Sequence, residues 1–213
     1  MKFDKQNFLL YAVTDRSWLN EKTLPQAVEQ ALRGGVTMLQ LREKEMDAAA
    51  FLEEALAVKA LCARYGVPFL IDDNVELAMQ CGADGVHVGQ SDMDAAQVRR
   101  RIGPEKILGV SAQTVEQALR AQAAGADYLG VGAVFSTSTK LDADEVSIDT
   151  LQRICAAVEI PVVAIGGICE ANLLRLSGSG IAGVAVVSAI FAAPAPEDAA
   201  RRLLGLAKKA VLC

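Results

Sequence analysis

Residues 81–89 (CGADGVHVG) and 124–132 (AGADYLGVG) share one pattern, and residues 179–187 (SGIAGVAVV) repeat it more loosely. In each stretch a residue that can end a helix precedes a short apolar run with the length of a buried strand. Counted along the chain, these runs form the fourth, sixth and eighth strands of an alternating series. Recurrence at every second strand favours a closed (β/α)8 barrel over an open doubly wound sheet, which is the alternative fold.

Apolar strand-like runs alternate with amphipathic helical segments along the whole chain, with no linker or low-complexity tract between them. The predicted strands span residues 9–14, 36–42, 67–72, 84–89, 106–110, 127–133, 161–166 and 182–187. The sequence therefore predicts a single α/β domain over residues 1–213, a TIM barrel with its phosphate sites at the C-terminal ends of the strands.

Composition and charge narrow the possible partners and location. The 213-residue chain has a net charge of −5 and no concentration of Lys and Arg, so it has no nucleic-acid footprint. Its longest apolar stretch, residues 181–195, is shorter than the roughly 20 residues of a membrane span. The five cysteines show no CxxC spacing, and the N-terminal apolar run is too brief for a signal peptide. We therefore expect a cytoplasmic protein with reduced thiols and without membrane or nucleic-acid partners; a homo-oligomer is left open.

Basic side chains follow the second predicted strand in the segment LQLREK. Strand alternation places Gln40 and Arg42 on one face, and Lys44 follows if the extended geometry persists. A guanidinium can bind two phosphate oxygens at once while an ammonium acts as a point charge, so the group suits a phosphorylated small molecule. A charged loop in solvent is an equally good interpretation of this stretch alone.

Acidic side chains follow the third and fourth predicted strands. Asp72 and Asp73 end one strand, and Asp92 follows the next, which should be its neighbour in the barrel. Two carboxylates, with the remaining positions left to water and substrate phosphates, are the usual ligands of Mg²⁺ in proteins. Taken singly, each aspartate is as well explained as a helix cap.

Hydroxyl groups and glycines follow the later strands. Residues 134–140 (VFSTSTK) end in Lys140, and this run of hydroxyls and backbone amides can form an anion cradle. A serine- and threonine-rich surface turn is the plainer alternative. Gly166 and Gly167 would let a phosphate approach the backbone, and Ser188 begins a helix whose free amides favour an anion.

His87, the only histidine, lies within a predicted strand and not at its end. A packed or hydrogen-bonded histidine is therefore a better interpretation than a general base, and a Ser-His-Asp triad is not expected. Proton transfer need not be the main catalytic demand.

Taken together, the polar strand ends resemble those of the thiamine-phosphate synthase family, over nearly the whole chain and in order. The matching stretches are YAVTDR (11–16), GVTMLQLREK (35–44), LIDDNVELA (70–78), GADGVHVGQSDM (82–93), LGVSAQT (108–114), GADYLGVGAVFSTSTK (125–140), IPVVAIGGI (160–168) and GVAVVSAI (183–190). The resemblance implies a Mg²⁺-dependent transferase. It would join 4-amino-2-methyl-5-hydroxymethylpyrimidine diphosphate to a thiazole phosphate by dissociative loss of diphosphate and capture of the cation by the thiazole nitrogen.

The resemblance also implies roles for individual residues. The residues that would contact the pyrimidine diphosphate are Gln40, Arg42, Lys44, Asp72, Ser111 and Lys140. Asp73 and Asp92 would bind Mg²⁺. The residues that would bind the thiazole phosphate are Thr137, Ser138, Thr139, Gly167, Val187 and Ser188. Arg42, Lys44 and Lys140 would be catalytic, because they would stabilise the leaving diphosphate.

Two positions depart from the family pattern. Many members have Asn where Asp72 stands, so Asp72 would contact the pyrimidine or join the metal site, and many have proline where Ser136 stands. Three rival functions are a thiazole tautomerase or regulator-like branch, a sugar-phosphate isomerase or epimerase, and a non-catalytic sensor of thiamine precursors. The first relies on an active-site histidine and the second on an acid–base pair, which the residues here do not favour.

Overall fold

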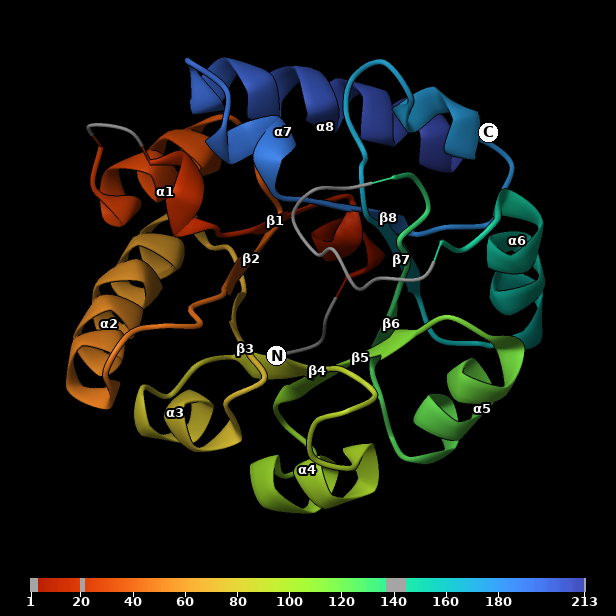
Figure 1. The fold of residues 1–213 in the computed structure, drawn as a ribbon, viewed down its shortest axis with the longest axis horizontal. Helices are drawn as coiled ribbons and strands as arrows, with labels where there is room; N and C mark the ends of the chain where they lie inside the picture. Colours follow the sequence, from red (N-terminus) through yellow and green to blue (C-terminus); the bar gives the residue numbers. More distant parts are fainter. Residues whose placement is uncertain (1–3, 20–21, 137–144, 213) are drawn as a thin grey trace.

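The computed structural model describes residues 4–19, 22–136 and 145–212. Within them, parallel strands pair in the order β1 to β8, and β8 pairs with β1 to close the barrel. Figure 1 looks down this barrel. The strands are β1 (Leu10–Val13), β2 (Met38–Leu41), β3 (Phe69–Asp72), β4 (Gly85–Val88), β5 (Ile107–Ala112), β6 (Tyr128–Val131), β7 (Val162–Ile165) and β8 (Gly183–Val186). All eight predicted strands and the barrel are confirmed.

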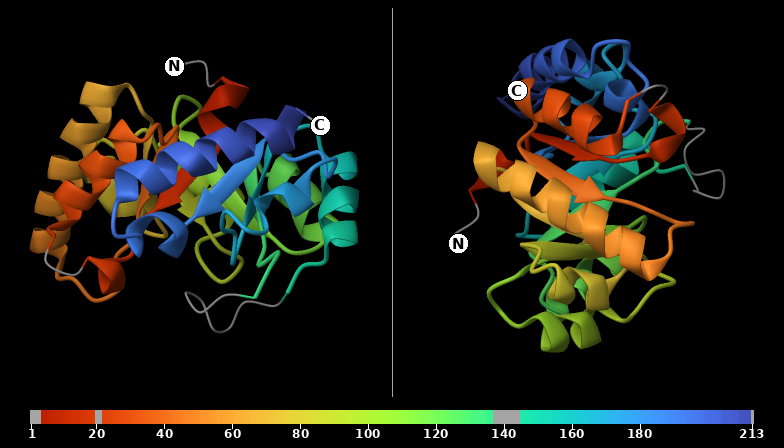
Figure 2. Two further views of the ribbon diagram at one scale, coloured as in Figure 1. Left: turned by 90° about the horizontal axis from the view of Figure 1, so that it is seen from above. Right: turned by 90° about the vertical axis from the view of Figure 1, so that its left-hand side faces the viewer.

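Helices surround the barrel, as the side views show (Figure 2). They are α1 (Leu24–Arg33), α2 (Ala48–Tyr65), α3 (Val75–Gln80), α4 (Ala95–Ile102), α5 (Val115–Ala123), α6 (Ile148–Ala157), α7 (Ser188–Phe191) and α8 (Pro196–Leu212). The described residues also form three short 3₁₀ turns: η1 (Lys5–Phe8) before β1, η2 (Arg16–Trp18) between β1 and α1, and η3 (Leu173–Leu176) between β7 and β8. None of these described helices combines the length and the apolar character that a membrane crossing requires.

The aspartate that the first two copies of the sequence repeat share has a structural role. Asp84 precedes β4, and its Oδ2 accepts a 2.9 Å hydrogen bond from the first amide of β3, at Phe69. Asp127 precedes β6, and its Oδ2 accepts a 2.7 Å hydrogen bond from Leu108 of β5. Thr37, just before β2, does the same for the first amide of β1 through its Oγ1. The side chain that precedes each of these even strands therefore binds an amide at the start of the strand before it and helps to set the register.

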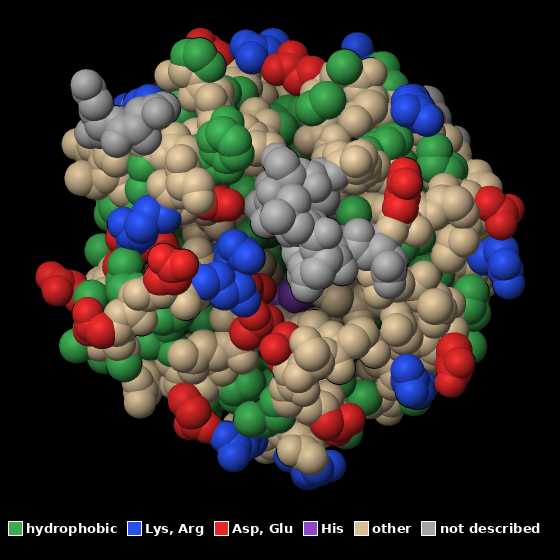
Figure 3. All heavy atoms as spheres, viewed as in Figure 1, with side chains coloured by type: hydrophobic (Ala, Val, Ile, Leu, Met, Phe, Trp, Pro, Cys, Tyr) green, Lys and Arg blue, Asp and Glu red, His purple; other side chains and the backbone are tan. Residues whose placement is uncertain are grey.

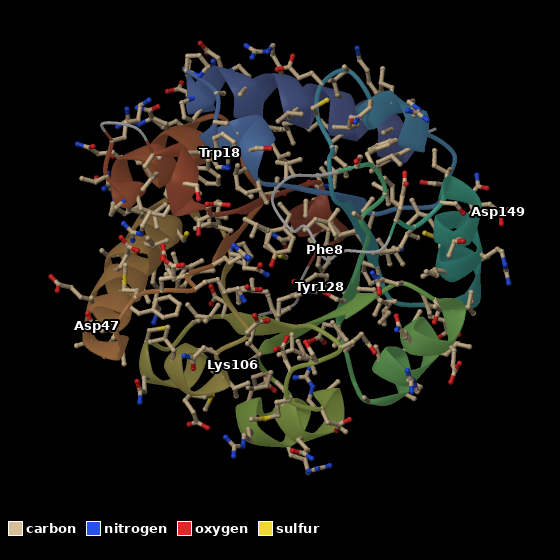
Figure 4. The ribbon with its side chains drawn as sticks, in the orientation of Figure 1. Phe8, Trp18, Asp47, Lys106, Tyr128 and Asp149 are labelled. Atoms are coloured by element: carbon tan, nitrogen blue, oxygen red, sulfur yellow. The ribbon has the colours of Figure 1, made fainter. Side chains whose placement is uncertain are left out.

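The strands bury both of their faces, but the two faces meet different neighbours. Most buried side chains pack between the barrel and the helices. A smaller cluster fills the barrel itself; its buried members are Phe8, Tyr11, Val13, Met38, Leu70, Ile107, Tyr128, Val163 and Ala185. Figure 4 shows Phe8 and Tyr128 together near the barrel centre, with ring centroids 5.2 Å apart. Because η1 supplies Phe8 from the N-terminal side, the interior of the barrel is a packed core and not a pore.

Replacing two glycines of this fold by alanine should change the free energy of unfolding in opposite directions. At Gly183 a Cβ atom would lie 1.7 Å from the carbonyl oxygen of Phe8, whereas Gly205 within α8 has nothing within 4 Å. We expect Gly183→Ala to lower the free energy of unfolding by about 2–3 kcal/mol, since η1 and β8 must move apart. We expect Gly205→Ala to raise it by about 1 kcal/mol through helix propensity. Urea unfolding followed by circular dichroism measures both; equal effects of the two substitutions would contradict the close contact at Gly183.

Candidate active site

The segment after β2 sends alternate side chains to opposite sides. Gln40 is 4% exposed and faces the barrel interior, where its Nε2 donates to the hydroxyl of Tyr11. The backbone amide of Arg42 donates to Oγ1 of the buried Thr14 at 2.9 Å, which ties the segment to the end of β1. Glu43 pairs with Arg16 on the other side. The expected alternation therefore continues past the end of β2 at Leu41.

Arg42 and Lys44 meet the carboxylates at the end of β3. Lys44 Nζ lies 2.5 Å from Asp73 Oδ2 and 3.6 Å from Asp72 Oδ2, and Arg42 Nε lies 3.6 Å from Asp72 Oδ2. The space-filling view shows basic and acidic side chains side by side at the hollowed mouth (Figure 3). The cations of the segment LQLREK are thus paired with the carboxylates at the end of β3, although Lys44 stays half exposed to solvent.

Asp72 is the most confined of these carboxylates, with 12% of its side chain exposed. Burial raises its pKa, and the charges of Lys44 and Arg42 oppose that rise without cancelling it. For Lys44, burial lowers the pKa, but the carboxylates of Asp73 and Asp72 outweigh burial and leave the pKa raised. The ammonium is therefore charged at neutral pH and holds two carboxylates at the mouth.

Asp73 and Asp92 face each other although 19 positions separate them in the sequence. Asp73 has a φ of 59°, in the left-handed region that aspartate adopts more readily than most residues, and its amide donates to the carbonyl of His87 at 2.8 Å. Asp92 accepts from the Gly89 amide at 2.7 Å. Burial, and then the neighbouring Asp73, raise the pKa of Asp92. The Asp73 carboxylate thus lies close enough to Asp92 to disfavour the charge of Asp92, and a cation between the two would favour it.

The helix-cap alternative does not account for these aspartates. The residue that caps α3 is Asn74, whose Oδ1 accepts from the Leu77 amide at 2.9 Å. The residue that caps α4 is Asp94, whose Oδ1 accepts from the Gln97 amide at 3.1 Å. The carboxylates that precede these caps are therefore available for another purpose.

The donors fit Mg²⁺ better than a metal that needs a full protein cage. Among the described residues, no three His, Cys, Asp or Glu side chains converge closely enough to hold a metal by themselves. A close pair of carboxylates, completed by waters and phosphate oxygens, is the arrangement typical of Mg²⁺. Asp73 and Asp92 suit this role, and Lys44 beside them suits a phosphate that bridges to the metal.

His87 is hydrogen-bonded within the barrel, as predicted. Its Nδ1 lies 2.8 Å from the Tyr128 hydroxyl and its Nε2 lies 2.9 Å from Ser111 Oγ. Its side chain is only partly buried and is visible at the bottom of the mouth as the single purple residue of Figure 3. The prediction for the fifth strand ended too early, since β5 continues to Ala112 and therefore holds Ser111 on a strand.

The opposite wall of the mouth is formed by the ends of β6, β7 and β8. Gly166 and Gly167 have φ values of 101° and 63°, and a Cβ on Gly167 would lie 2.3 Å from the carbonyl oxygen of Ser136. These glycines thus allow the loops after β6 and β7 to pack backbone against backbone. Val187 precedes α7 without a side-chain cap for the helix that begins at Ser188. The four remaining predicted residues, Thr137, Ser138, Thr139 and Lys140, lie outside the described residues.

The sequence analysis missed several residues of this region. Thr14 holds Arg42, and Tyr11 and Tyr128 are fully buried phenols within otherwise apolar strands. Gln90 Nε2 donates to the carbonyl of Ser111 at 2.7 Å and so holds the backbone at the end of β5. The two tyrosines could have been identified from the sequence, because each lies within an apolar strand. A buried phenol there must find a hydrogen-bond partner inside the barrel.

A closed parallel barrel with paired cations and carboxylates at its C-terminal mouth defines a (β/α)8-barrel protein with a charged cluster at the end of the barrel where proteins of this fold carry their active sites. The model of the family described as thiamine monophosphate synthase matches residues 10–190. This chain therefore belongs to the thiamine monophosphate synthase family.

Relatives of known name agree with this assignment. The chain is 53% identical to the thiamine-phosphate synthase of Ruminiclostridium cellulolyticum over 200 residues, which are 94% of this chain and 95% of the relative. It is 46% identical to the thiamine-phosphate synthase of Clostridium acetobutylicum, with 95% and 96% of the two chains covered. The solved structure of thiamine phosphate pyrophosphorylase from Pyrococcus furiosus superposes with a TM-score of 0.90 at 35% identity, over 97% of this chain and 98% of that one.

Asp72 yields a prediction about stability. Its folded pKa is raised, so its ionisation costs stability as the pH rises from the ordinary carboxyl pKa through the folded one. Asp72→Asn removes this cost, so we expect a higher free energy of unfolding at neutral pH and no gain in acid, where the wild-type carboxyl is protonated in both states. Urea unfolding across a pH series without divalent cations measures the difference. A loss of stability at neutral pH would mean that the pairs with Arg42 and Lys44 outweigh burial.

Proposed function

We propose that this protein is a thiamine-phosphate synthase. It would condense 4-amino-2-methyl-5-hydroxymethylpyrimidine diphosphate with a thiazole phosphate to give thiamine phosphate and diphosphate. Besides family membership, the observation that carries the proposal is the cluster at the mouth, in which Arg42 and Lys44 lie among the carboxylates of Asp72, Asp73 and Asp92. Such a cluster suits a substrate that carries several negative charges and a metal ion.

The basic residues would act on the leaving diphosphate. Arg42 is held by Asp72 and, through its backbone amide, by Thr14, so its guanidinium is at the mouth before the substrate arrives. The ammonium of Lys44 is kept at the same mouth by Asp72 and Asp73. As the carbon–oxygen bond breaks, negative charge grows on the diphosphate, and cations already in place stabilise this charge more than that of the ground state. On the resemblance, Lys140 would add a third cation.

Asp73 and Asp92 would hold Mg²⁺, which when bound supplies positive charge to the diphosphate oxygens. Lys44 lies against Asp73. Because its side chain is 49% exposed, its ammonium would also be able to turn toward the substrate phosphates.

Gln40 and Ser111 would bind the pyrimidine ring at the uncharged floor of the mouth. Glycine and amide groups on the far wall, at Gly167 and at the start of α7, would bind the thiazole phosphate. The dissociative reaction needs no general base, which agrees with a histidine engaged by Tyr128 and Ser111. Departure of diphosphate would leave a cation on the pyrimidine methylene, and the thiazole nitrogen would donate the electron pair of the new carbon–nitrogen bond.

The thiols support a cytoplasmic location for this enzyme. The described cysteines, Cys62, Cys81, Cys155 and Cys169, form no disulfide. Burial raises the pKa of Cys62 to about 12 and that of Cys155 to about 11, so both stay protonated and unreactive at neutral pH.

The decisive test mixes the purified protein with the pyrimidine diphosphate and the thiazole phosphate, with and without Mg²⁺, and follows thiamine phosphate by its fluorescent oxidation product. We expect formation that depends on Mg²⁺. Binding of both compounds without product would contradict the transferase and favour a sensor or a tautomerase. Failure to bind either compound would leave only a phosphate-binding barrel.

The metal assignment makes a separate prediction. Asp73→Asn and Asp92→Asn should each lower turnover at limiting Mg²⁺ by about 100-fold or more, since the charge that holds the ion is lost. Asp149→Asn, on an exposed position of the first turn of α6, is the matched control and should keep wild-type turnover. Calorimetric titration of Mg²⁺ in the presence of pyrimidine diphosphate gives the affinity directly. If Asp73→Asn and Asp92→Asn both depend on Mg²⁺ as the wild-type protein does, these residues do not bind the ion.

Lys140 is expected to act in the chemical step. Because charge on the leaving group grows only toward the transition state, Lys140→Ala should lower kcat by about 100-fold and change KM for either substrate much less. Single-turnover measurements separate the chemical step from binding. A rise in KM at constant kcat would instead make Lys140 a binding residue.

A further inference from the structure

A chain of hydrogen-bonded side chains crosses the barrel from β2 to β5. Gln40 Nε2 donates to the Tyr11 hydroxyl at 2.7 Å, and that hydroxyl lies 2.9 Å from the hydroxyl of Tyr128. The Tyr128 hydroxyl lies 2.8 Å from His87 Nδ1, and His87 Nε2 lies 2.9 Å from Ser111 Oγ. Gln40 and Ser111, at the two ends, are the residues proposed above to bind the pyrimidine. The three residues between them have no role so far.

The amide at one end determines the direction of every hydrogen bond in this chain. An amide nitrogen can only donate, so the Tyr11 oxygen accepts from Gln40. Tyr11 is fully buried, and its own proton also needs an acceptor; the Tyr128 oxygen, 2.9 Å away, meets this need when Tyr11 is the donor of that pair. The Tyr128 proton then turns to His87 Nδ1, which must be unprotonated. A neutral imidazole of this kind carries its proton on Nε2 and donates it to Ser111 Oγ. The Ser111 proton is thereby turned away from the barrel core.

Burial keeps the phenols in the state that this direction requires. It raises the pKa of Tyr11 and of Tyr128 well above the ordinary tyrosine value. Both hydroxyls therefore retain their protons and act as one donor and one acceptor each throughout the physiological range. A lost or misdirected proton would leave a polar group without a hydrogen-bond partner in an apolar barrel, which is unfavourable.

Glycines on neighbouring strands make room for this chain. A Cβ on Gly109 would lie 2.2 Å from Cζ of Tyr128 and 2.5 Å from His87 Nδ1, and a Cβ on Gly130 would lie 3.0 Å from Cε1 of His87. The first two copies of the sequence repeat place glycine and a large side chain at opposite positions. Gly85 in the first copy stands where Tyr128 stands in the second, and His87 stands where Gly130 does. The barrel interior is thus shaped around this tyrosine and histidine.

We propose that Tyr11, Tyr128 and His87 are positioning residues that set the hydrogen-bond polarity of the pyrimidine subsite. With the chain running from Gln40 to Ser111, the subsite presents the Gln40 carbonyl as an acceptor and the Ser111 hydroxyl as a donor. This pair complements an aminopyrimidine, whose exocyclic amino group donates and whose ring nitrogen accepts. A 4-oxo ring offers the opposite pattern and is rejected. The inference rests on the proposed function for the identity of the ligand.

The single histidine makes the polarity directly measurable. Protein labelled with ¹⁵N-histidine has only the two ring nitrogens of His87 to report, and their chemical shifts distinguish the tautomers. In the ligand-free wild-type protein at neutral pH we expect the neutral form with its proton on Nε2. A proton on Nδ1, or an imidazolium, would overturn the proposal, and this readout requires neither turnover nor a variant.

Selectivity for the ring gives a second test. Calorimetry compares the dissociation constants of the pyrimidine diphosphate and of its 4-oxo analogue in the presence of Mg²⁺. Tyr128→Phe interrupts the chain between Tyr11 and His87 and should lower the preference for the amino compound by about tenfold or more. Tyr65→Phe is the matched control, since it also removes one phenolic hydroxyl, but from the exterior of the barrel, where it contacts Glu29. It should keep the wild-type preference.

The outcomes separate this inference from the proposed function. An equal loss of affinity for both pyrimidines in Tyr128→Phe would indicate a merely structural role and overturn the proposal. An unchanged preference in that variant would do the same. If the wild-type protein prefers the aminopyrimidine and carries the expected tautomer but forms no thiamine phosphate, the polarity stands and the synthase reaction fails. Thermal unfolding of the variant confirms that it is folded; the histidine measurement decides if it is not.

Discussion

The hydrogen-bonded closure of β8 onto β1 is the constraint on which the rest of this molecule depends. It leaves no strand edge and turns the C-terminal ends of all eight strands toward one mouth. Residues that are far apart in the sequence, such as Lys44 and Asp92, thereby become neighbours. The same closure requires the inward positions to fill the barrel, so any polar group placed there must find its partner inside.

Polar groups are stabilised in different ways at the C-terminal mouth of the barrel and on the floor beneath it, where the side chains from Gln40 to Ser111 lie. At the mouth, cations and carboxylates lie in partial contact with water and offset one another's charge. On the floor, uncharged groups from Gln40 to Ser111 satisfy one another in sequence. The charged rim therefore suits the diphosphate, whose charge changes in the reaction, and the uncharged floor suits recognition of a neutral ring.

Glycine has two separate uses in this barrel. Gly167 lets the loops after β6 and β7 approach each other closely. Gly109 leaves space inside the barrel for the ring of Tyr128 and the imidazole of His87. Close backbone contact shapes the wall of the mouth in the first case, and a missing side chain shapes the floor in the second. Small residues thus determine where the larger polar ones can lie.

The sequence by itself determined the barrel, the eight strands and most of the residues at their ends, because strand periodicity, turn glycines and in-order family motifs are local signals. It also placed Arg42, Lys44 and the aspartates at one mouth. It did not show whether Lys44 is paired with carboxylates or surrounded by water, or whether Asp92 caps a helix. It also gave no role to Tyr11 and Tyr128. Only the tertiary structure decided these points. A side chain's burial and hydrogen-bond partners are supplied by other strands, and no local pattern encodes a contact such as that between Tyr11 and Tyr128, 117 residues apart.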